Sequence, residues 1–417
     1  MRKLALLAMI LLVGLICLQC SKSTDPAPAP NPPPDLNSSD KSLIQSSNRF
    51  GLTLFRNIVA AEADSKNVFV SPLSVSFALG MTLNGARGET FDAMQSTLEL
   101  SGLTRDEINA SYKKVVELLA GLDPNVAFSI ANSIWYRNGF PISPAFVEVN
   151  RNYFNAATRG LDFDQVWAAD TINHWVDINT RGKITEIIKP PIDPSTIMFL
   201  INAIYFKGDW TLPFDTASTV NLPFTRGDGS TVERPIMRTD TLLSYMTNDL
   251  FQAVDLPYGD EKFSMVVLLP KSGHTTDDIV AQLTDENWAA WMSSFAKIEL
   301  PLGLPKFKLA YEIKLNDVLK AMGMSIAFDP GMADLLGMVD ETAELPGNLF
   351  ISFVKHKSFV QVDELGTEAA AVTIVGIDLT SIGEEMVITS PFLFAIRERA
   401  TGTILFIGKI DDPVWEG

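Results

Sequence analysis

Residues 363 to 391 read Asp-Glu-Leu-Gly-Thr-Glu-Ala-Ala-Ala-Val-Thr-Ile-Val-Gly-Ile-Asp-Leu-Thr-Ser-Ile-Gly-Glu-Glu-Met-Val-Ile-Thr-Ser-Pro. Most connections in compact domains are about 4–6 residues long, so a segment of this length is either functional or disordered. Between Thr367 and Ile377 it contains no proline, one glycine and many β-branched residues, which is the composition of a strand. The sequence therefore predicts a long loop that is able to become a strand.

Read with the period of two that strands have, this loop has two different faces. One face is uncharged and begins with small side chains: Thr367, Ala369, Ala371, Thr373, Val375 and Ile377. The opposite face carries a charge at each end, at Glu368 and Asp378. Burial of the first face would leave no charge inside the protein without a partner. Insertion into the middle of a sheet requires such a face.

Two strings beside this loop resemble a known family. Residues 362–371, Val-Asp-Glu-Leu-Gly-Thr-Glu-Ala-Ala-Ala, resemble the proximal hinge of the serpins. Ser390-Pro391-Phe392-Leu393-Phe394 and the later Phe406-Ile407-Gly408-Lys409 resemble the segments that come after the serpin reactive loop. The resemblance implies an α+β serpin fold: a large central, mostly antiparallel sheet, further sheets, a set of helices and an exposed reactive loop at about 364–390. It also implies that the loop is protease bait that inserts into the main sheet after cleavage, a known example of strand addition.

The same resemblance assigns roles to particular residues. The hinge residues would be Glu364, Gly366, Thr367, Glu368, Ala369, Ala370 and Ala371. The residues around the opening of the sheet would be Ser71, Ser74, Asn202, Trp210, Lys306 and His356. Within this second set, Ser71 and Ser74 belong to a family string at 67–90, and Asn202 and Trp210 to another at 202–210.

One position and two contacts are implied at the sheet opening. Trp210 would lie at the top of the sheet, where the loop first enters. Lys306 would form a surface ion pair with Glu364, of a kind that contributes about 0–1 kcal/mol. His356 would hydrogen-bond Asn202 and lock the closed sheet, and protonation would then bury a charge and loosen it.

Simpler interpretations of these residues stay open. Ser71, Ser74 or Ser76 could be an N-cap or a first-turn serine of a helix that begins at Pro72. A tryptophan in an apolar run is usually a core residue. A lone histidine is usually a satisfied buried residue, and the chain has only three histidines in all.

Counting along the family pattern places the cleaved bond between Thr380 and Ser381, with Ile377, Asp378 and Leu379 in the preceding subsites. Threonine is small and β-branched, so it suits a shallow elastase-like or a broad subtilisin-like pocket. It cannot supply the cation that a trypsin-like pocket binds. A shift of one residue would present Leu379 instead and would favour chymotrypsin-like enzymes.

Composition excludes several other functions. The net charge of −17 disfavours nucleic acid or heparin as a partner, since these polyanions bind clustered Lys and Arg. The two cysteines, Cys17 and Cys20, both lie in the leader, so we expect neither a disulfide nor a thiolate metal site in the folded domain, and no cofactor. No Gly-x-Ser-x-Gly or His-Glu-x-x-His motif is present, which argues against a hydrolase.

The first 42 residues indicate export. Arg2 and Lys3 precede an apolar run, residues 4–18, that is too short to span a membrane and is typical of an export signal. Cys20 then precedes a Pro- and Ser-rich spacer, as in a bacterial lipoprotein. We therefore expect a signal at 1–20 with lipidation at Cys20, a tether at 21–42 and a serpin domain at 43–413. Signal cleavage with release is the alternative, and the Cys-Leu-Gln-Cys spacing could also be a redox motif.

Within the domain, periodicity predicts an amphipathic helix from Leu43 to Ala63 and a second helix from Asp278 to Ala296. It predicts strands at 251–258 and 263–270, joined by a turn at Gly259-Asp260. The predicted function is suicide inhibition of serine proteases by a monomer. A serpin-fold binding or chaperone protein is the alternative, and the small hinge residues 369–371 argue against it because they permit insertion.

Overall fold

The structure is a computed structural model, and it describes residues 35–62, 67–345, 347–367 and 384–415. Several predictions concern residues outside this part of the chain. They are the export signal, Cys20 and most of the tether; the hinge residues Glu368, Ala369, Ala370 and Ala371; and the reactive-bond residues Ile377, Asp378, Leu379, Thr380 and Ser381. These predictions stay predictions.

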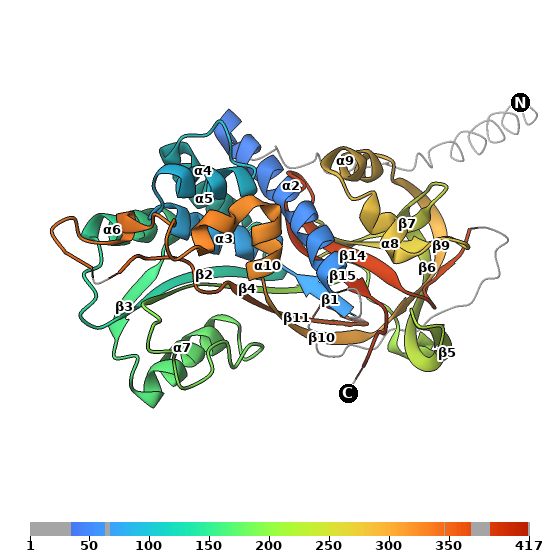
Figure 1. Ribbon diagram of the computed structural model, residues 1–417. Helices are drawn as coiled ribbons and strands as arrows, with labels where there is room; N and C mark the ends of the chain where they lie inside the picture. The colour runs from blue at the N-terminus through green and yellow to red at the C-terminus, as the bar shows by residue number, and fades with distance from the viewer. Residues whose placement is uncertain (1–34, 63–66, 346, 368–383, 416–417) are drawn as a thin grey trace, which may run out of the picture. The chain divides into compact units, whose positions relative to one another are not determined.

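Helices precede, connect and cover the sheets of the described chain (Figure 1). They are α2 Ser38–Ala61, α3 Pro72–Leu83, α4 Gly88–Thr97, α5 Arg105–Leu119, α6 Pro144–Phe154, α7 Val166–Asn179, α8 Thr276–Ala281, α9 Asp285–Ser293 and α10 Asn316–Leu319. Short helical turns are η1 Thr216–Ser218, η2 Lys320–Met324, η3 Ser325–Phe328 and η4 Leu336–Met338. Among the described helices, none combines the length and the hydrophobicity needed to cross a membrane.

Capping residues explain where the structure departs from the predicted helices. Asn37 and Asp40 form a capping box, so α2 begins at Ser38 and includes residues 38–42, which the sequence assigned to the tether. The single predicted helix from Asp278 to Ala296 is wrong. Thr275 and Thr284 each accept a hydrogen bond from a first-turn amide, which starts α8 and α9 separately, and Ala296 already begins a strand.

A six-stranded sheet, called the main sheet here, has the order β10-β11-β12-β4-β2-β3. Its strands are β10 Phe307–Lys314, β11 Lys355–Asp363, β12 Gly366–Thr367, β4 Met198–Asp209, β2 Val126–Arg137 and β3 Ala157–Leu161. Every neighbouring pair is antiparallel except β2 and β3, which are parallel. The predicted α+β class with a large, mostly antiparallel sheet is confirmed.

A second sheet has nine strands. Eight of them follow the order β1-β15-β14-β8-β7-β6-β9-β13, and the ninth, β5, lies outside this order and pairs with β6. Its strands are β1 Asn67–Val70, β5 Val220–Thr225, β6 Thr231–Thr247, β7 Phe251–Tyr258, β8 Phe263–Pro270, β9 Ala296–Pro305, β13 Met386–Val387, β14 Phe392–Glu398 and β15 Ile404–Ile410. The two predicted strands at 251–258 and 263–270 match β7 and β8 residue for residue.

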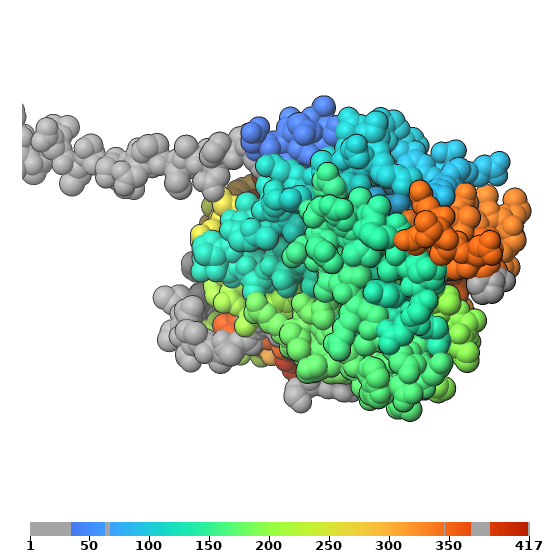
Figure 2. All heavy atoms as spheres, turned by 90° about the vertical axis from the view of Figure 1, so that its left-hand side faces the viewer, coloured from blue at the N-terminus to red at the C-terminus, as the bar shows by residue number. Residues whose placement is uncertain are grey.

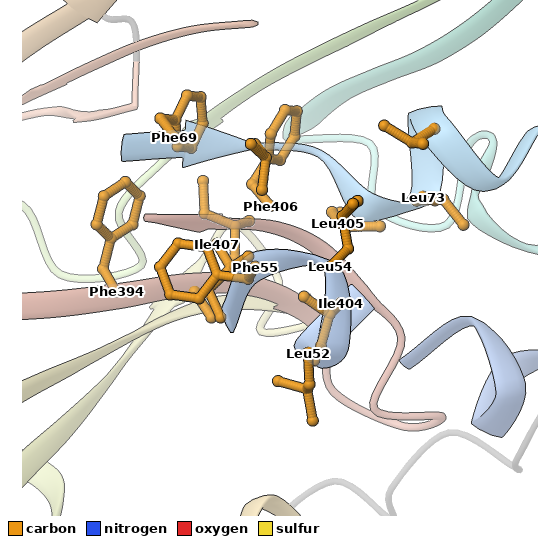
Figure 3. Packing of buried hydrophobic residues seen from close by; sticks show 14 of the residues in the cluster. Leu52, Leu54, Phe55, Phe69, Leu73, Phe394, Ile404, Leu405, Phe406 and Ile407 are labelled. Carbon is orange, nitrogen blue, oxygen red and sulfur yellow. The ribbon is translucent and has the colours of Figure 1, made fainter. Parts of the chain in front are cut away.

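Figure 3 shows part of the largest hydrophobic core, where side chains of α2 and α3 lie near those of β1, β14 and β15. Every residue of β14 and β15 is buried, which explains why both read as nearly continuous apolar runs. Phe69 stacks on Phe394 and Phe406, with ring centroids 5.5 Å and 5.3 Å away. Gly408 must lack a side chain, because a Cβ there would lie 2.5 Å from the Phe394 ring.

A second core lies on the opposite face of the main sheet, under α7. Alternate residues of β4 separate the two cores: Phe199 and Ile201 belong to the α7 side, whereas Ile204 and Phe206 belong to the large core. Figure 2 views the molecule from the side of α6, β3 and α7, whose teal and green side chains form a continuous surface there. Both faces of β4 are therefore covered, but alternate residues of β11 are only half-buried, so a strand entering between β4 and β11 would be fully buried on one face only.

Candidate functional site: the hinge and the gap in the main sheet

The main sheet contains a gap between β4 and β11. The two-residue strand β12 is the segment that joins them, because Gly366 and Thr367 pair with β11 on one side and with β4 on the other. Over the rest of the described strands, no backbone pairing joins residues 198–207 of β4 to residues 355–361 of β11. Each strand is paired along its other edge, so the facing edges are complementary to one further strand.

A cavity of about 200 Å³ lies at this gap. Its lining combines residues 198–204 of β4, residues 355–357 of β11, one side of α3 and the segment 348–354. Side chains of the described residues thus leave space between the two strands. Unpaired backbone groups inside a protein cost free energy, so a strand that paired with them would stabilise the sheet.

Thr367 marks the point where the loop enters the sheet. Its side chain is 3% exposed, and its hydroxyl lies 2.6 Å from the Tyr258 hydroxyl. The preceding Gly366 touches β4 so closely that a Cβ would lie 2.1 Å from the carbonyl oxygen of Gly208. Thr367, the first residue of the uncharged face of the loop, therefore points into the core, as the two-face pattern allows.

Trp210 holds the turn that leads into β12. Its indole N–H donates to the carbonyl of Asp363 at 2.9 Å, and its backbone N–H donates to the carbonyl of Leu365 at 2.7 Å. The ring is 4% exposed and stacks on Tyr258 with a centroid separation of 4.5 Å. Trp210 thus lies at the loop entrance, where the sequence placed it, and it is also a core residue.

Lys306 and Glu364 form the predicted ion pair, with 2.7 Å between Nζ and Oε2. The expectation of a surface pair was wrong, because the side chains are only 16% and 8% exposed. Thr219 donates its hydroxyl to the other carboxylate oxygen at 2.7 Å, and the Phe214 N–H donates to the Glu364 carbonyl at 2.8 Å. Burial alone would raise the pKa of Glu364, but the hydrogen bonds from Lys306 and Thr219 outweigh it and lower the pKa.

Ser71 connects α3 to β11 through His356. Ser71 is the N-cap of α3: its hydroxyl accepts from the Ser74 N–H at 3.2 Å and donates to the Leu405 carbonyl at 2.7 Å. The backbone N–H of Ser71 donates to Nε2 of His356 at 3.0 Å. This bond requires Nε2 to carry no proton, so the folded state holds His356 in its neutral form.

The predicted hydrogen bond between His356 and Asn202 is not formed. Asn202 instead donates to the Asn132 side chain at 2.8 Å across β2 and β4. Its buried side-chain oxygen has no hydrogen-bond partner in the described structure. Both Asn202 and His356 line the cavity, but they bond to opposite sides of it. The reason is that the free N–H at the start of α3 lies within reach of β11.

A family model described as serpin, serine protease inhibitor, matches residues 45–413. The chain belongs to the serpin family. It is 33% identical over 373 residues to human neuroserpin, covering 86% of this chain and 88% of that protein. It is 34% identical over 385 residues to a leukocyte elastase inhibitor of Xenopus tropicalis, covering 89% of this chain and 100% of the relative. The crystal structure of the thermophilic serpin tengpin in its native state matches with a TM-score of 0.81 and 31% identity, covering 91% of this chain and 96% of that one.

Sequence reasoning missed several residues that hold the hinge of this serpin. Tyr258 joins Thr367 to the Trp210 ring, and its complete burial raises its pKa. Thr219 bonds the hinge carboxylate, and Asn132 bonds Asn202. None of them stands in a motif with a chemical role. Of these residues, only Tyr258 carried a signal in the sequence, because the predicted strand at 251–258 ends there.

The stability of this serpin should fall at acidic pH through His356. Burial lowers the pKa of His356 from 6.5 to about 4. Between these pH values the unfolded chain binds a proton that the folded chain does not, so folding stability is lost as the pH falls from 6.5 towards 4. The shift corresponds to about 3 kcal/mol. We expect His356→Gln to remove this part of the pH dependence, as measured by urea unfolding at pH 7 and at pH 4.5.

His274, which is exposed, offers the matched control. His274→Gln should keep the wild-type pH dependence of unfolding, because it leaves the buried His356 in place. Asp411, whose pKa burial raises to about 6, contributes with the opposite sign. Asp411 is present in every variant, so its contribution to the pH dependence is the same in each and cancels when the variants are compared. Equal pH dependence in His356→Gln and in wild type would show that His356 does not act in this way.

Proposed function

We propose that this serpin is a suicide-substrate inhibitor of serine proteases that is cleaved between Thr380 and Ser381. The protease serine adds to the Thr380 carbonyl, and the bond to the Ser381 nitrogen breaks. That nitrogen takes up a proton and leaves as a new amino terminus, while the protease stays attached to Thr380 through an ester. The freed segment 367–379 then inserts between β4 and β11 and carries the protease with it. Distortion of the enzyme prevents hydrolysis, since a misplacement of about 1 Å can cost roughly a hundredfold in rate.

The observation that carries this proposal is the gap between β4 and β11, with the loop already joined to its top at β12. The gap presents two facing strand edges that lack a partner over the rest of the described strands. An inhibitor of this type needs them, because the inserted segment must gain backbone hydrogen bonds on both sides. At about 0.5–1.5 kcal/mol net for each bond, a dozen inserted residues supply a large driving force.

The pattern of the loop fits the faces of the gap. Thr367 points at Tyr258 inside the core, so strand alternation would direct residues 369 and 371, both alanine, to the same side. Glu368 would then face the α7 side of the sheet. Small residues at the leading end meet the least steric resistance when the strands part.

The type of target protease follows from Thr380. A small β-branched side chain fits a shallow or permissive pocket, as in elastase-like or subtilisin-like enzymes. The similarity to a leukocyte elastase inhibitor supports the elastase-like choice. Export of the chain and lipidation at Cys20 would place the inhibitor outside the cytoplasm, where secreted proteases act.

A panel of serine proteases tests the proposal. Each enzyme is mixed with the serpin, the products are separated on a denaturing gel, and the released peptide is analysed by mass spectrometry. Elastase or subtilisin should give a covalent band and a peptide that begins at Ser381, whereas trypsin should not cleave at that bond. Thr380→Arg should redirect the trapping to trypsin. Cleavage without any covalent band across the panel would contradict inhibition and favour the binding-protein alternative. A peptide beginning at Thr380 would move the bond to Leu379.

A further inference from the structure

The segment after β15, Asp411–Trp415, leaves the nine-stranded sheet and reaches the first residues of β10. Asp412 anchors its beginning through two arginines, with Arg226 Nε and Arg234 Nη2 each 2.7 Å from a carboxylate oxygen. Its end pairs with the main sheet, because the Lys308 N–H donates to the Val414 carbonyl at 2.8 Å. The segment therefore bridges the two sheets, and its position is determined at both ends.

The last described residue of this bridge, Trp415, contacts the hinge lysine. The Lys306 ammonium lies 4.3 Å from the centre of the Trp415 ring. The same nitrogen lies 2.7 Å from the Glu364 carboxylate. One ammonium thus has two partners from different parts of the chain: a carboxylate at the base of the loop and an aromatic ring beyond β15. Neither the hinge motif nor the trapping of a protease assigns a role to Trp415.

We propose that Trp415 is a positioning residue for the hinge, acting through Lys306. A lysine side chain has four rotatable bonds and would otherwise exchange between the carboxylate and water. The negative face of the indole attracts the ammonium and shields it from solvent, and so keeps it on Glu364. Glu364 in turn holds the turn that leads to Gly366 and Thr367. Loss of the ring should loosen this turn and let β12 separate from β4 more often.

The effect should be moderate because the turn has other supports. Trp210 and Phe214 hold the carbonyls of Asp363, Leu365 and Glu364 directly, without Lys306. Removal of one partly shielded cation–π contact should therefore raise the opening rate of the hinge by about three- to tenfold. The consequence for inhibition rests on the proposed function, whereas the effect on the hinge itself does not.

Hydrogen exchange of the full chain without protease tests the proposal. Amides in peptides that cover residues 205–210 and 362–367 are followed in wild type, W415A and W415F. We expect exchange to be faster by about three- to tenfold in W415A and by less in W415F, because the smaller phenyl ring binds a cation more weakly. The matched control is W167A, which removes a half-exposed tryptophan at the start of α7 and should leave hinge exchange unchanged.

A second comparison separates the ammonium contact from simple packing. In a Lys306→Met background the cation is absent, so adding W415A should produce no further acceleration. The proposal would be overturned if W415A accelerated hydrogen exchange equally in both backgrounds. It would also be overturned if W415A did not accelerate exchange in the wild-type background. If W415A does not fold, W415F in the two backgrounds carries the same comparison. Because no protease is present, these results stand apart from the covalent-band assay, which alone decides whether the chain inhibits.

Discussion

Thr367→Arg is expected to abolish covalent trapping of the protease while the loop is still cleaved. Thr367 is 3% exposed and its hydroxyl contacts the Tyr258 hydroxyl between β11 and β4. A guanidinium at this position would have to leave water, at a cost of several kcal/mol. The arginine would therefore leave the sheet in the intact protein, and insertion after cleavage would have to bury it at its first step. Hydrolysis of the ester would then be faster than insertion, and the protease would be released. On a denaturing gel with elastase, the covalent band should disappear and the cleaved serpin should remain.

Glu368→Arg is the matched control for this prediction. It introduces the same side chain one residue later, where strand alternation predicts the opposite, less restrictive face. We expect Glu368→Arg to retain most of the covalent band, with the cleavage rate compared in parallel for both variants. If Thr367→Arg still trapped the protease as well as wild type, insertion at β12 could not be the step that traps it.

Cleavage of the loop should make the serpin much harder to unfold by heat. The intact protein leaves the facing edges of β4 and β11 unpaired over most of their described length. Insertion of a dozen residues would add backbone hydrogen bonds along both edges and fill the cavity. At about 0.5–1.5 kcal/mol for each bond the gain is about 10 kcal/mol, which corresponds to a rise in Tm of about 10 °C for a domain of this size. Calorimetry of the intact and the cleaved protein measures this rise.

The Thr367→Arg protein gives the sharpest comparison for the thermal experiment. Its loop should still be cut, but its Tm should rise little, because the severed segment cannot enter the gap. This separates the effect of insertion from that of cutting the chain. An unchanged Tm after cleavage of the wild-type protein would contradict the account in which insertion provides the energy.

Local sequence patterns predicted the elements whose signals lie within a few residues. β7 and β8 begin and end where their apolar runs do, and α3 begins at Pro72. The capping boxes of Asn37 with Asp40 and of Thr275 with Asp278 were also present in the sequence. Reading them would have corrected the start of α2 and the start of α8, because a cap is encoded within four residues.

Contacts at the sheet opening were predicted less well, for a physical reason. The Lys306–Glu364 pair was predicted, but its surroundings include Thr219, Phe214 and Trp415, which come from two other parts of the chain. The partner of His356 is the backbone N–H of Ser71, 285 residues away. A backbone donor has no sequence signature, so side-chain types alone favoured Asn202.

By itself the sequence determined the serpin family, the α+β class, the bounds of β7 and β8, and a hinge segment with one small, uncharged face. These features depend on the alternation and size of neighbouring side chains, which any short window of sequence displays. Only the tertiary structure decided that β4 and β11 stand apart below β12, that Ser71 rather than Asn202 bonds His356, and that Trp415 covers the hinge lysine. Each of these depends on how segments more than a hundred residues apart are brought together in space.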